Sequence, residues 1–367
     1  MRLYYLSLQA TREGQASFAH VHEIVRGLVK RGWQVCLFEP DYGRCGTLPG
    51  PAGRLLEFIR AQKHIWMQKP RPNVIYIRWH FASWPTALWA RWRGLPVVQE
   101  VNGPYEDVFI AWPWTRPFAW LFLALMRSQL KWAKAVITVT RQLADWVVAE
   151  SGNRKVHVIP NGANTDLFQP GLCAPEGSDR GYALFFGSLA SWQGIETMLE
   201  AVARSDWPEQ VSLVIAGDGA EKARVEAAAA QNPKIHYLGL CSYHDMPRII
   251  SDALCGLSPK NNRGFRSLTG LSPLKVYETL ACGVPVVVSD FPGVADLVRE
   301  NGIGLIIPPS DAKALASAVT YLHGHPSEGK RMGQRGRRLV EWEHSWDRRA
   351  ADTAEVLKRI CCFPGGD

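Results

Sequence analysis

Short apolar runs alternate with stretches of helical apolar spacing along the first 160 residues. Residues 2–9 predict a strand, and a polar turn follows. Apolar positions from Phe18 to Val29 then recur at helical spacing, and Gln34–Phe38 predicts a second strand. The same alternation predicts strands at 74–77, 96–101, 135–139 and 156–159, with helices at 85–92 and from Gln142. Strands that alternate with helices in this way predict a mostly parallel sheet covered by helices on both faces.

The alternation stops at residues 167–181, which contain prolines and glycines and no apolar periodicity. After this segment it restarts, with strands predicted at 182–186, 212–216, 235–238, 253–258, 285–289 and 303–307. Helices are predicted at 194–203, 221–230, 246–251, 274–281 and 294–299, and two more close the chain. The predicted fold class is therefore α/β, with two Rossmann-like doubly wound domains and an interdomain cleft.

We place the domain boundaries by the same pattern. Residues 1–170 form the first domain, 171–181 the linker, and 182–344 the second domain. A helix at 345–367 is expected to return to the first domain. A chain of 367 residues has the length for two domains rather than one.

Composition narrows the possible partners. The net charge of +8 is compatible with nucleic acid, an anionic membrane surface or phosphorylated substrates. The basic residues are scattered and accompany no nucleic-acid-binding motif, so we expect no nucleic-acid partner. The cysteines show neither C-x-x-C pairs nor metal-ligand spacing, which indicates free thiols in a reducing cytoplasm and no metal site. The first ten residues contain no signal-peptide apolar region, so a cytoplasmic location is expected.

The segment 267–290 carries the clearest chemical signal. Ser272 and Pro273 predict a helix start, with the serine as the cap and the proline in the first turn. The exposed N–H groups and the positive helix end form an anion site, to which Lys275 adds a full charge. Glu278, one turn further, can accept hydrogen bonds from a ribose diol. The simpler alternative is an ordinary helix start followed by a surface carboxylate.

The stretch SPLKVYETLACGVPVVVSD resembles the donor-binding segment of glycosyltransferase family four, the group 1 retaining transferases of the GT-B fold. Four shorter stretches resemble other family segments and occur in the same order: IPNGANTDLF at 159–168, FGSLASWQG at 186–194, AGDG at 216–219 and YLGL at 237–240. The resemblance implies a nucleoside-diphosphate sugar bound mainly by the second domain and an acceptor bound by the first. It also implies retention of anomeric configuration, and no metal or other cofactor.

The resemblance implies roles for particular residues. Glu278 would hold the ribose, and the backbone N–H groups of Leu274 and Lys275 would hold the phosphates beside Ser272 and Pro273. Gly239 and Leu240 would lie near the base. The strand-end loops at Gly187, Gln193 and Gly217, with Gly270, would complete the donor site.

The sequence departs from the family pattern in three places. Gly270 stands where the family often has a first carboxylate, and Ser188 and Gln193 stand where it often has an arginine and a lysine. The cations that remain are Lys260, Arg263, Arg266 and Lys275, with Lys260 first among them. Asn102 stands where the family usually has a histidine. It can donate to a sugar hydroxyl or carbonyl but cannot act as a general base. Catalysis would then rest on positioning and on stabilising the departing diphosphate, with Lys260, Lys275 and Asn102 as the catalytic candidates.

The first domain contains further candidate positions. Gly14 and Gln15 lie in the first βα turn and could bind the donor phosphate or the acceptor, or form a plain turn capped by Ser17. His80 follows a strand and is a candidate for the acceptor site. His20 and His22 are expected to have surface or packing roles on the helix that follows the turn.

Residues 109–132 predict a membrane-facing surface. The apolar run 117–126 would rise about 15 Å as a helix, half of the roughly 30 Å hydrocarbon core, so it cannot span a bilayer. It is flanked by aromatic and basic residues that suit an interfacial helix: Trp112, Trp114, Trp120, Trp132, Arg116, Arg127, Lys131 and Lys134. The partners expected are therefore a nucleotide-sugar donor, a lipid-linked or saccharide acceptor, and the inner face of the cytoplasmic membrane. The alternative is a buried helix of the first domain.

Two other classes of protein remain open. A dinucleotide-dependent oxidoreductase would share the Rossmann-like halves, but no strand here leads into G-x-G-x-x-G. A non-catalytic scaffold could keep the fold and dock on a membrane. Binding of nucleotides discriminates among the three classes.

Overall fold

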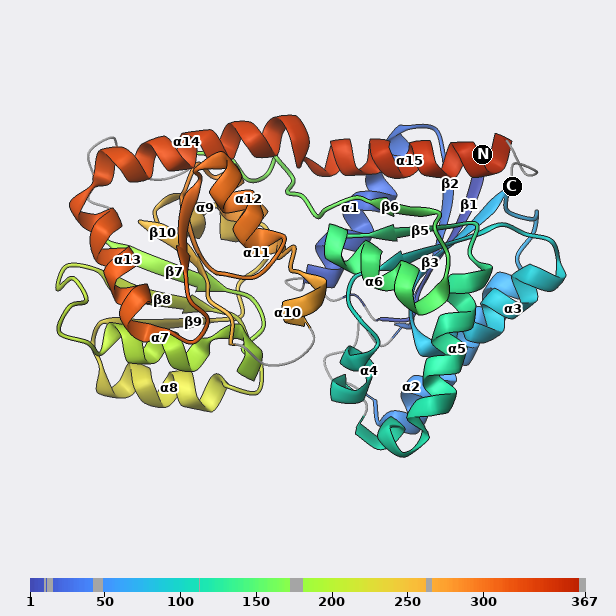
Figure 1. The fold of residues 1–367 in the computed structure, drawn as a ribbon, viewed down its shortest axis with the longest axis horizontal. Helices are drawn as coiled ribbons and strands as arrows, with labels where there is room; N and C mark the ends of the chain where they lie inside the picture. Colours follow the sequence, from blue (N-terminus) through green and yellow to red (C-terminus); the bar gives the residue numbers. More distant parts are fainter. Residues whose placement is uncertain are drawn as a thin grey trace. The chain divides into compact units, whose positions relative to one another are not determined.

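A computed structural model describes residues 1–9, 11, 16–41, 49–111, 113–171, 181–261 and 266–362. The chain divides into two compact units, each built on one six-stranded sheet (Figure 1). The first unit contains β1, Ser17–Pro160 and the C-terminal residues from Arg349. The second unit contains Asn161–Arg348.

The sheet of the first unit is parallel throughout, with the strand order β2-β1-β3-β4-β5-β6. Its strands are β1 (Arg2–Ser7), β2 (Gln34–Phe38), β3 (Val74–Arg78), β4 (Val97–Val101), β5 (Ala135–Thr138) and β6 (Val156–Val158). The central strands β3, β4 and β5 are buried along almost their whole length, and most of their residues are apolar. The strand order reverses between β1 and β3, which is where a doubly wound sheet binds ligands.

The helices of the first unit connect these strands. They are α1 (Ala16–Lys30), α2 (Pro51–Met67), η2 (Phe81–Ser83), α3 (Trp84–Trp92), α4 (Glu106–Ala111), η3 (Pro113–Phe118), α5 (Ala119–Trp132), α6 (Arg141–Ser151) and α15 (Trp346–Cys362). Gly27 of α1 brings that helix close to Ala350 of α15, because a Cβ at Gly27 would lie 2.3 Å from the Ala350 Cβ. The residues of α15 from Arg349 onward therefore pack on the first unit.

The second unit has a parallel sheet of order β12-β11-β10-β7-β8-β9. Its strands are β7 (Tyr182–Phe186), β8 (Ser212–Ala216), β9 (Ile235–Gly239), β10 (Cys255–Ser258), β11 (Val286–Ser289) and β12 (Gly304–Ile307). Its helices are η4 (Ser191–Gln193), α7 (Ile195–Val202), α8 (Lys222–Gln231), α9 (Met246–Ser251), α10 (Arg266–Thr269), α11 (Leu274–Ala281), α12 (Val294–Asn301), α13 (Ala312–Gly324) and α14 (Pro326–Glu343). The strand order reverses between β7 and β10, so the carboxyl ends of these two strands mark the expected ligand site.

The structure contains helices that the sequence pattern did not predict. Three helices, α13, α14 and α15, close the chain where two were predicted. The apolar pattern did not predict α2, whose apolar residues lie on two sides of the helix instead of one.

Residues 161–168 are held by the second unit. The Asn161 amide Nδ2 donates to the Ser272 carbonyl at 2.6 Å, and the Asn161 backbone N–H donates to the Ser272 Oγ at 3.2 Å. Phe168 is fully buried in the apolar core of this unit. The division into units therefore falls just after Pro160, before the segment that the sequence marks as the linker.

Candidate functional site

Two lysine side chains meet where the strand order of the second sheet reverses. Gly187 follows β7 directly, and Lys260 follows β10 after one residue. The Lys260 ammonium donates to the Gln193 Oε1 at 2.6 Å, and the Lys275 ammonium lies 3.4 Å from the same oxygen. Lys260 is buried and Lys275 is partly buried. Two of the predicted cations are thus brought together on one neutral amide oxygen.

Lys275 lies in an environment that disfavours its charge. Its ammonium is 3.6 Å from the centre of the Phe185 ring, which stabilises a cation only in part. Burial lowers the pKa of Lys275 well below its usual value, the neighbouring charge of Lys260 lowers it further, and Glu278 opposes both. A bound anion would relieve the repulsion between the two lysines. Such an anion would therefore gain energy from both charges.

The start of α11 has no side-chain cap. Pro273 is the N-cap residue, with extended backbone angles, so the predicted cap at Ser272 is wrong. The Ser272 hydroxyl is instead engaged by the Tyr277 hydroxyl at 3.0 Å and by the Asn161 backbone N–H. Because no side chain caps the helix, the N–H groups of its first turn remain suited to an anion.

Glu278 lies on α11 one turn beyond Lys275 and is only 6% exposed. A surface carboxylate would be largely exposed, so this observation disfavours the simpler alternative. The Glu278 charge also favours the charged form of Lys275. The carboxylate and the two lysines thus belong to one electrostatic unit at the start of α11.

Glycines at the strand ends keep the backbone close to this site. Gly187 and Gly217 have positive φ angles, and a Cβ at Gly217 would lie 1.9 Å from the Gly187 carbonyl oxygen. A Cβ at Gly187 would lie 3.4 Å from the Lys275 ammonium. Gly239 and Gly270 also have positive φ angles, and Leu240 is largely exposed. A side chain at Gly187 would therefore contact the Lys275 ammonium.

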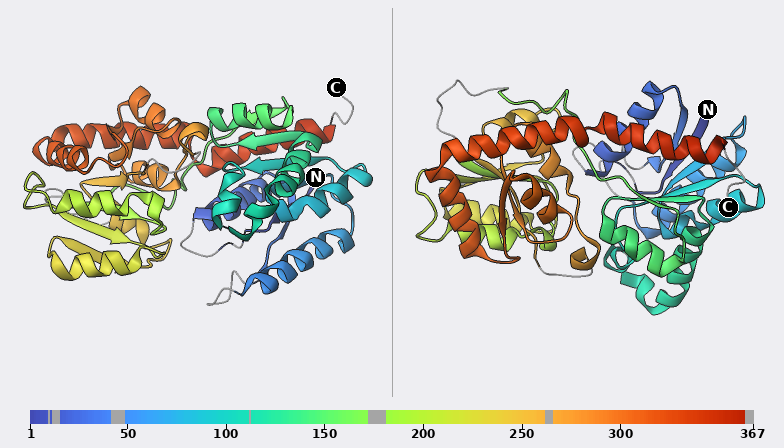
Figure 2. Two further views of the ribbon diagram at one scale, coloured as in Figure 1. Left: turned by 60° about the horizontal axis from the view of Figure 1, so that its bottom comes forward. Right: turned by 45° about the horizontal axis from the view of Figure 1, so that its top comes forward.

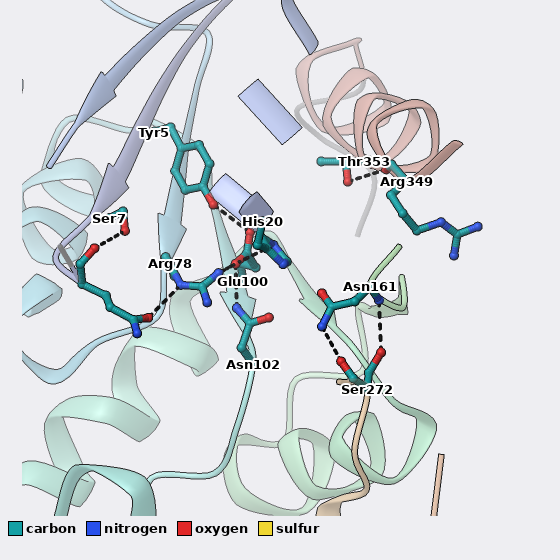
Figure 3. Close-up of polar contacts among 11 residues, drawn as sticks. Tyr5, Ser7, His20, Arg78, Glu100, Asn102, Asn161, Ser272, Arg349 and Thr353 are labelled. Atoms are coloured by element: carbon teal, nitrogen blue, oxygen red, sulfur yellow. Dashed lines mark hydrogen bonds and ion pairs between the residues drawn. The ribbon is translucent and has the colours of Figure 1, made fainter. Parts of the chain in front are cut away.

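A second polar cluster lies at the strand reversal of the first sheet (Figure 3). One Glu100 carboxylate oxygen contacts the Arg78 guanidinium and accepts from the Asn102 Nδ2 at 2.6 Å. It also lies 3.1 Å from the His20 Nε2. The other oxygen accepts from the Tyr5 hydroxyl at 2.9 Å. Glu100 thus joins side chains from β1, α1, β3 and the end of β4.

Glu100 stays ionised despite its burial. Burial acts to raise the pKa of this carboxyl, but His20 and Arg78, with hydrogen bonds from His20 and Asn102, hold it well below its usual range. The sequence pattern predicts no role for Glu100 or Arg78, and it predicts a surface or packing role for His20. The signal was weak because the partners lie far apart in the sequence. The available indication of this cluster was that buried strands have polar residues inside them or at their ends, as in VVQEVN.

Asn102 has a defined orientation. Its Nδ2 donates to Glu100, so its Oδ1 points away from the carboxylate (Figure 3). This Oδ1 has no hydrogen-bond partner in the described part of the chain. The sequence analysis expected Asn102 to donate to a ligand, but one of its donors is already used. The side that it presents is a hydrogen-bond acceptor.

His80 is held in its neutral form. Its Nδ1 accepts the Ala82 backbone N–H at 3.2 Å, and burial lowers the pKa of the ring to about 4. Its role toward an acceptor stays a prediction. The remaining candidates lie outside what the structure describes: Gly14, Gln15, Arg263 and the side chain of Arg266.

Residues 109–132 fall in α4, η3 and α5, and α5 contains residues 119–126 of the apolar run predicted as a helix. Phe118, Trp120 and Leu121 are exposed, and Trp120 is 69% exposed. Trp132 is half-buried and contacts Trp84 and Arg91 of α3. The side chains of Trp112 and Trp114 lie outside the described residues. Among the described residues, no helix is both long and apolar enough to cross a bilayer.

Family models match both units. The model for glycosyl transferases group 1 matches residues 174–339, and the model for glycosyltransferase family 4 matches residues 18–167. The chain is 25% identical over 281 residues to the MMP alpha-(1->4)-mannosyltransferase of Mycolicibacterium hassiacum, covering 72% of the chain and 66% of that protein. It is 24% identical to the alpha-maltose-1-phosphate synthase of Mycolicibacterium smegmatis, covering 64% of the chain and 65% of that protein. These alignments thus span just under two thirds of either relative.

Solved structures resemble the whole fold. The sucrose-phosphate synthase of Thermosynechococcus elongatus has a TM-score of 0.80 at 19% identity, and the similarity covers 99% of both chains. The structure of HepE from Anabaena in complex with UDP-glucose has a TM-score of 0.71 at 16% identity, covering 98% of this chain and 99% of that one. These similarities confirm the predicted fold class, two doubly wound α/β domains.

Proposed function

Since the chain belongs to the group 1 glycosyl transferases and has their GT-B fold, we propose that it transfers a sugar from a nucleoside-diphosphate sugar to an acceptor hydroxyl. The acceptor would be a saccharide or a lipid-linked saccharide, in polysaccharide or glycoconjugate biosynthesis. The observation that carries the proposal is the pair Lys260 and Lys275 beside the uncapped start of α11. A diphosphate has the charge and the size for this group of donors.

The donor would bind along the second unit. Its diphosphate would contact Lys260, Lys275 and the first N–H groups of α11, and its ribose would contact Glu278. The base would lie toward Gly239 and Leu240. HepE, which shares the fold, binds UDP-glucose, and this supports a nucleotide sugar as the donor. The lysines and amides would supply the positive charge that the diphosphate needs, so the proposal includes no metal.

The proposed reaction retains anomeric configuration. The acceptor oxygen forms a bond to the anomeric carbon on the face from which the diphosphate leaves, and the bond between that carbon and the phosphate oxygen breaks. The leaving diphosphate oxygen takes the proton of the acceptor hydroxyl. Lys260 and Lys275 would stabilise the charge that develops on the diphosphate, which is where electrostatic catalysis contributes most.

The acceptor would bind at the carboxyl edge of the first sheet. There Asn102 presents its Oδ1, which would accept a hydrogen bond from a hydroxyl of the acceptor other than the one that attacks. Glu100 would act as a positioning residue, because it fixes the amide of Asn102 and the guanidinium of Arg78. In this assignment the buried Glu100 carboxylate positions Asn102 for the acceptor. An apolar side chain could fill the same space but could not hold that amide.

Nucleotide binding tests the proposal. UDP and GDP, followed by NAD, are added singly, and the unfolding temperature is measured. We expect a rise with a nucleoside diphosphate, followed by hydrolysis or transfer when the matching sugar nucleotide is supplied. A rise with NAD alone would support an oxidoreductase, and no response to any nucleotide would support a non-catalytic scaffold. Either result would overturn the proposal.

Diphosphate binding should be coupled to proton uptake. The free protein holds the pKa of Lys275 well below 10.5, and a bound diphosphate favours the charged form, which raises the pKa again. Affinity for UDP should therefore be constant below the pKa of the free protein and fall as the pH rises above it. Calorimetry in buffers of different ionisation enthalpy measures the protons taken up. The Lys275→Met variant should take up no protons on binding UDP. If the affinity of the wild type for UDP did not fall above the pKa of Lys275 in the free protein, the coupling would be contradicted.

Glu100→Gln should impair the acceptor side selectively. The variant weakens charge-assisted hydrogen bonds of about 1.5–3 kcal/mol each, so kcat/KM for the acceptor should fall roughly 10- to 100-fold. UDP affinity should stay unchanged, because the donor residues belong to the other unit. Tyr5→Phe is the matched control, since it removes one hydrogen bond to the same carboxylate and leaves Asn102 held. Equal losses in UDP affinity and acceptor efficiency would argue against a positioning role.

A further inference from the structure

Helix α2 (Pro51–Met67) has apolar residues on two sides. Its buried side, Phe58, Ala61, Gln62 and Ile65, packs on the first unit. The Gln62 Oε1 accepts from the Thr86 backbone N–H at 3.2 Å and from its hydroxyl at 2.8 Å, which fixes α2 on α3. This side accounts for the attachment of the helix to the domain. It does not account for the apolar residues on the other side.

The second side carries five large apolar residues that are between 39% and 66% exposed. These residues, which we call the α2 stripe, are Leu55, Leu56, Ile59, Trp66 and Met67. With a period of 3.6 residues they lie on one side of the helix, away from the buried residues. In Figure 2 (left) α2 lies at the margin of the first unit. Several exposed apolar residues gathered on one side of a helix are the composition expected of an interaction site.

Charge indicates which partner the α2 stripe meets. The exposed Lys63 lies on the same side as the stripe, and Arg54 and Arg60 lie on the same helix. The acidic residue of the helix, Glu57, is paired with Arg60 at 2.6 Å. The exposed Lys69 and Arg71 follow the helix directly. The helix and its C-terminal flank are therefore basic, which is complementary to an anionic surface.

A second copy of the chain fits the α2 stripe less well. Packing of two stripes would desolvate Lys63 against apolar residues of the copy, which is costly for an unpaired charge. At a lipid surface, the aliphatic stem of Lys63 can lie among the acyl chains while its ammonium reaches the phosphates. We propose that the α2 stripe docks the first unit on an anionic lipid bilayer. This surface is separate from residues 109–132, and the inference does not depend on sugar transfer.

Vesicle flotation of the full chain tests the proposal. The vesicles are phosphatidylcholine alone, or phosphatidylcholine mixed with phosphatidylglycerol. The wild type should bind the mixed vesicles, and Leu56→Ser/Ile59→Ser/Met67→Ser should bind them at least about tenfold more weakly. These three side chains are exposed, so the unfolding temperature should be unchanged. Trp342→Ser, which alters an 80% exposed tryptophan of α14, is the matched control and should bind as the wild type does.

Three further measurements make the outcome decisive. Lys63→Met should reduce the preference for anionic vesicles about fivefold without weakening binding to phosphatidylcholine.

Phe118→Ser/Trp120→Ser/Leu121→Ser tests the other exposed surface. If only this variant lost vesicle binding, the proposal would be wrong. Sedimentation tests whether a second copy binds instead. The docking proposal would also be overturned if the wild type bound no vesicles and self-associated in a way that the α2 variant abolished. UDP affinity of the α2 variant should be unchanged, so failure of docking is distinguishable from failure of the transferase proposal.

Discussion

In the Glu278→Ala variant, kcat/KM for the donor should fall roughly 100-fold or more. The variant would lose about two charge-assisted hydrogen bonds to the ribose, each of about 1.5–3 kcal/mol. It would also lose the negative charge that favours the charged form of Lys275. Both losses act on the donor, so the acceptor KM should change little. Steady-state kinetics with the correct sugar nucleotide measure the effect.

Glu278→Gln and an exposed glutamate provide the controls. Glu278→Gln keeps the size and one oxygen acceptor, so its loss should be smaller than that of the alanine variant. Glu226→Ala alters an exposed residue of α8 in the same unit and should leave kinetics unchanged. Because Glu278 is buried, the unfolding temperature of each variant is measured as well. Turnover by Glu278→Ala equal to that of the wild type would show that the ribose is not held there.

The second large effect is expected for Lys260→Met/Lys275→Met. Each lysine would contribute a charge-assisted hydrogen bond of about 1.5–3 kcal/mol to the diphosphate. The double variant should therefore bind UDP at least roughly 100-fold more weakly, while its affinity for uridine, which has no phosphate, stays the same. The difference in affinity between UDP and uridine, measured by calorimetry, should nearly disappear.

Stability should change in the opposite direction. Methionine at 275 removes a cation whose charge is disfavoured by burial and by Lys260, so the unfolding temperature of Lys275→Met should rise. A residue kept for packing would instead lose stability on substitution. Lys222→Met, an exposed position of α8, is the matched control for both measurements. Unchanged UDP affinity in the double variant would remove the lysines from the donor site.

The alternation of strands and helices could be predicted because parallel strands buried on both faces are short continuous apolar runs. The strand at Tyr182–Phe186 and the helices Met246–Ser251 and Leu274–Ala281 have the predicted bounds. Helix α2 could not be predicted from one-sided periodicity, because Leu55 and Ile59 add apolar residues to its exposed side. The prolines at 113 and 117 lie before α5 (Ala119–Trp132), which contains residues 119–126 of the predicted interfacial helix without a break.

The two polar clusters differ in how far the sequence predicts them. Ser272–Glu278 is a continuous segment. Its pattern of a helix start followed by a lysine and a glutamate therefore predicts both Lys275 and Glu278 as site residues. The cap was assigned one residue too early, because the Ser272 hydroxyl is engaged by Tyr277 and Asn161. Glu100 depends on Tyr5, His20 and Arg78, which only the folding of the first unit brings together. Such long-range pairs leave no signature at fixed spacing.

A crystal structure with UDP bound tests the central claim most directly. The claim is that the first turn of α11, with Lys260 and Lys275, holds the diphosphate of the donor. We predict density for both phosphates within hydrogen-bond distance of the Lys275 ammonium and the backbone N–H groups of Leu274 and Lys275. Density for the diphosphate at any other place, with the start of α11 unoccupied, would contradict the claim.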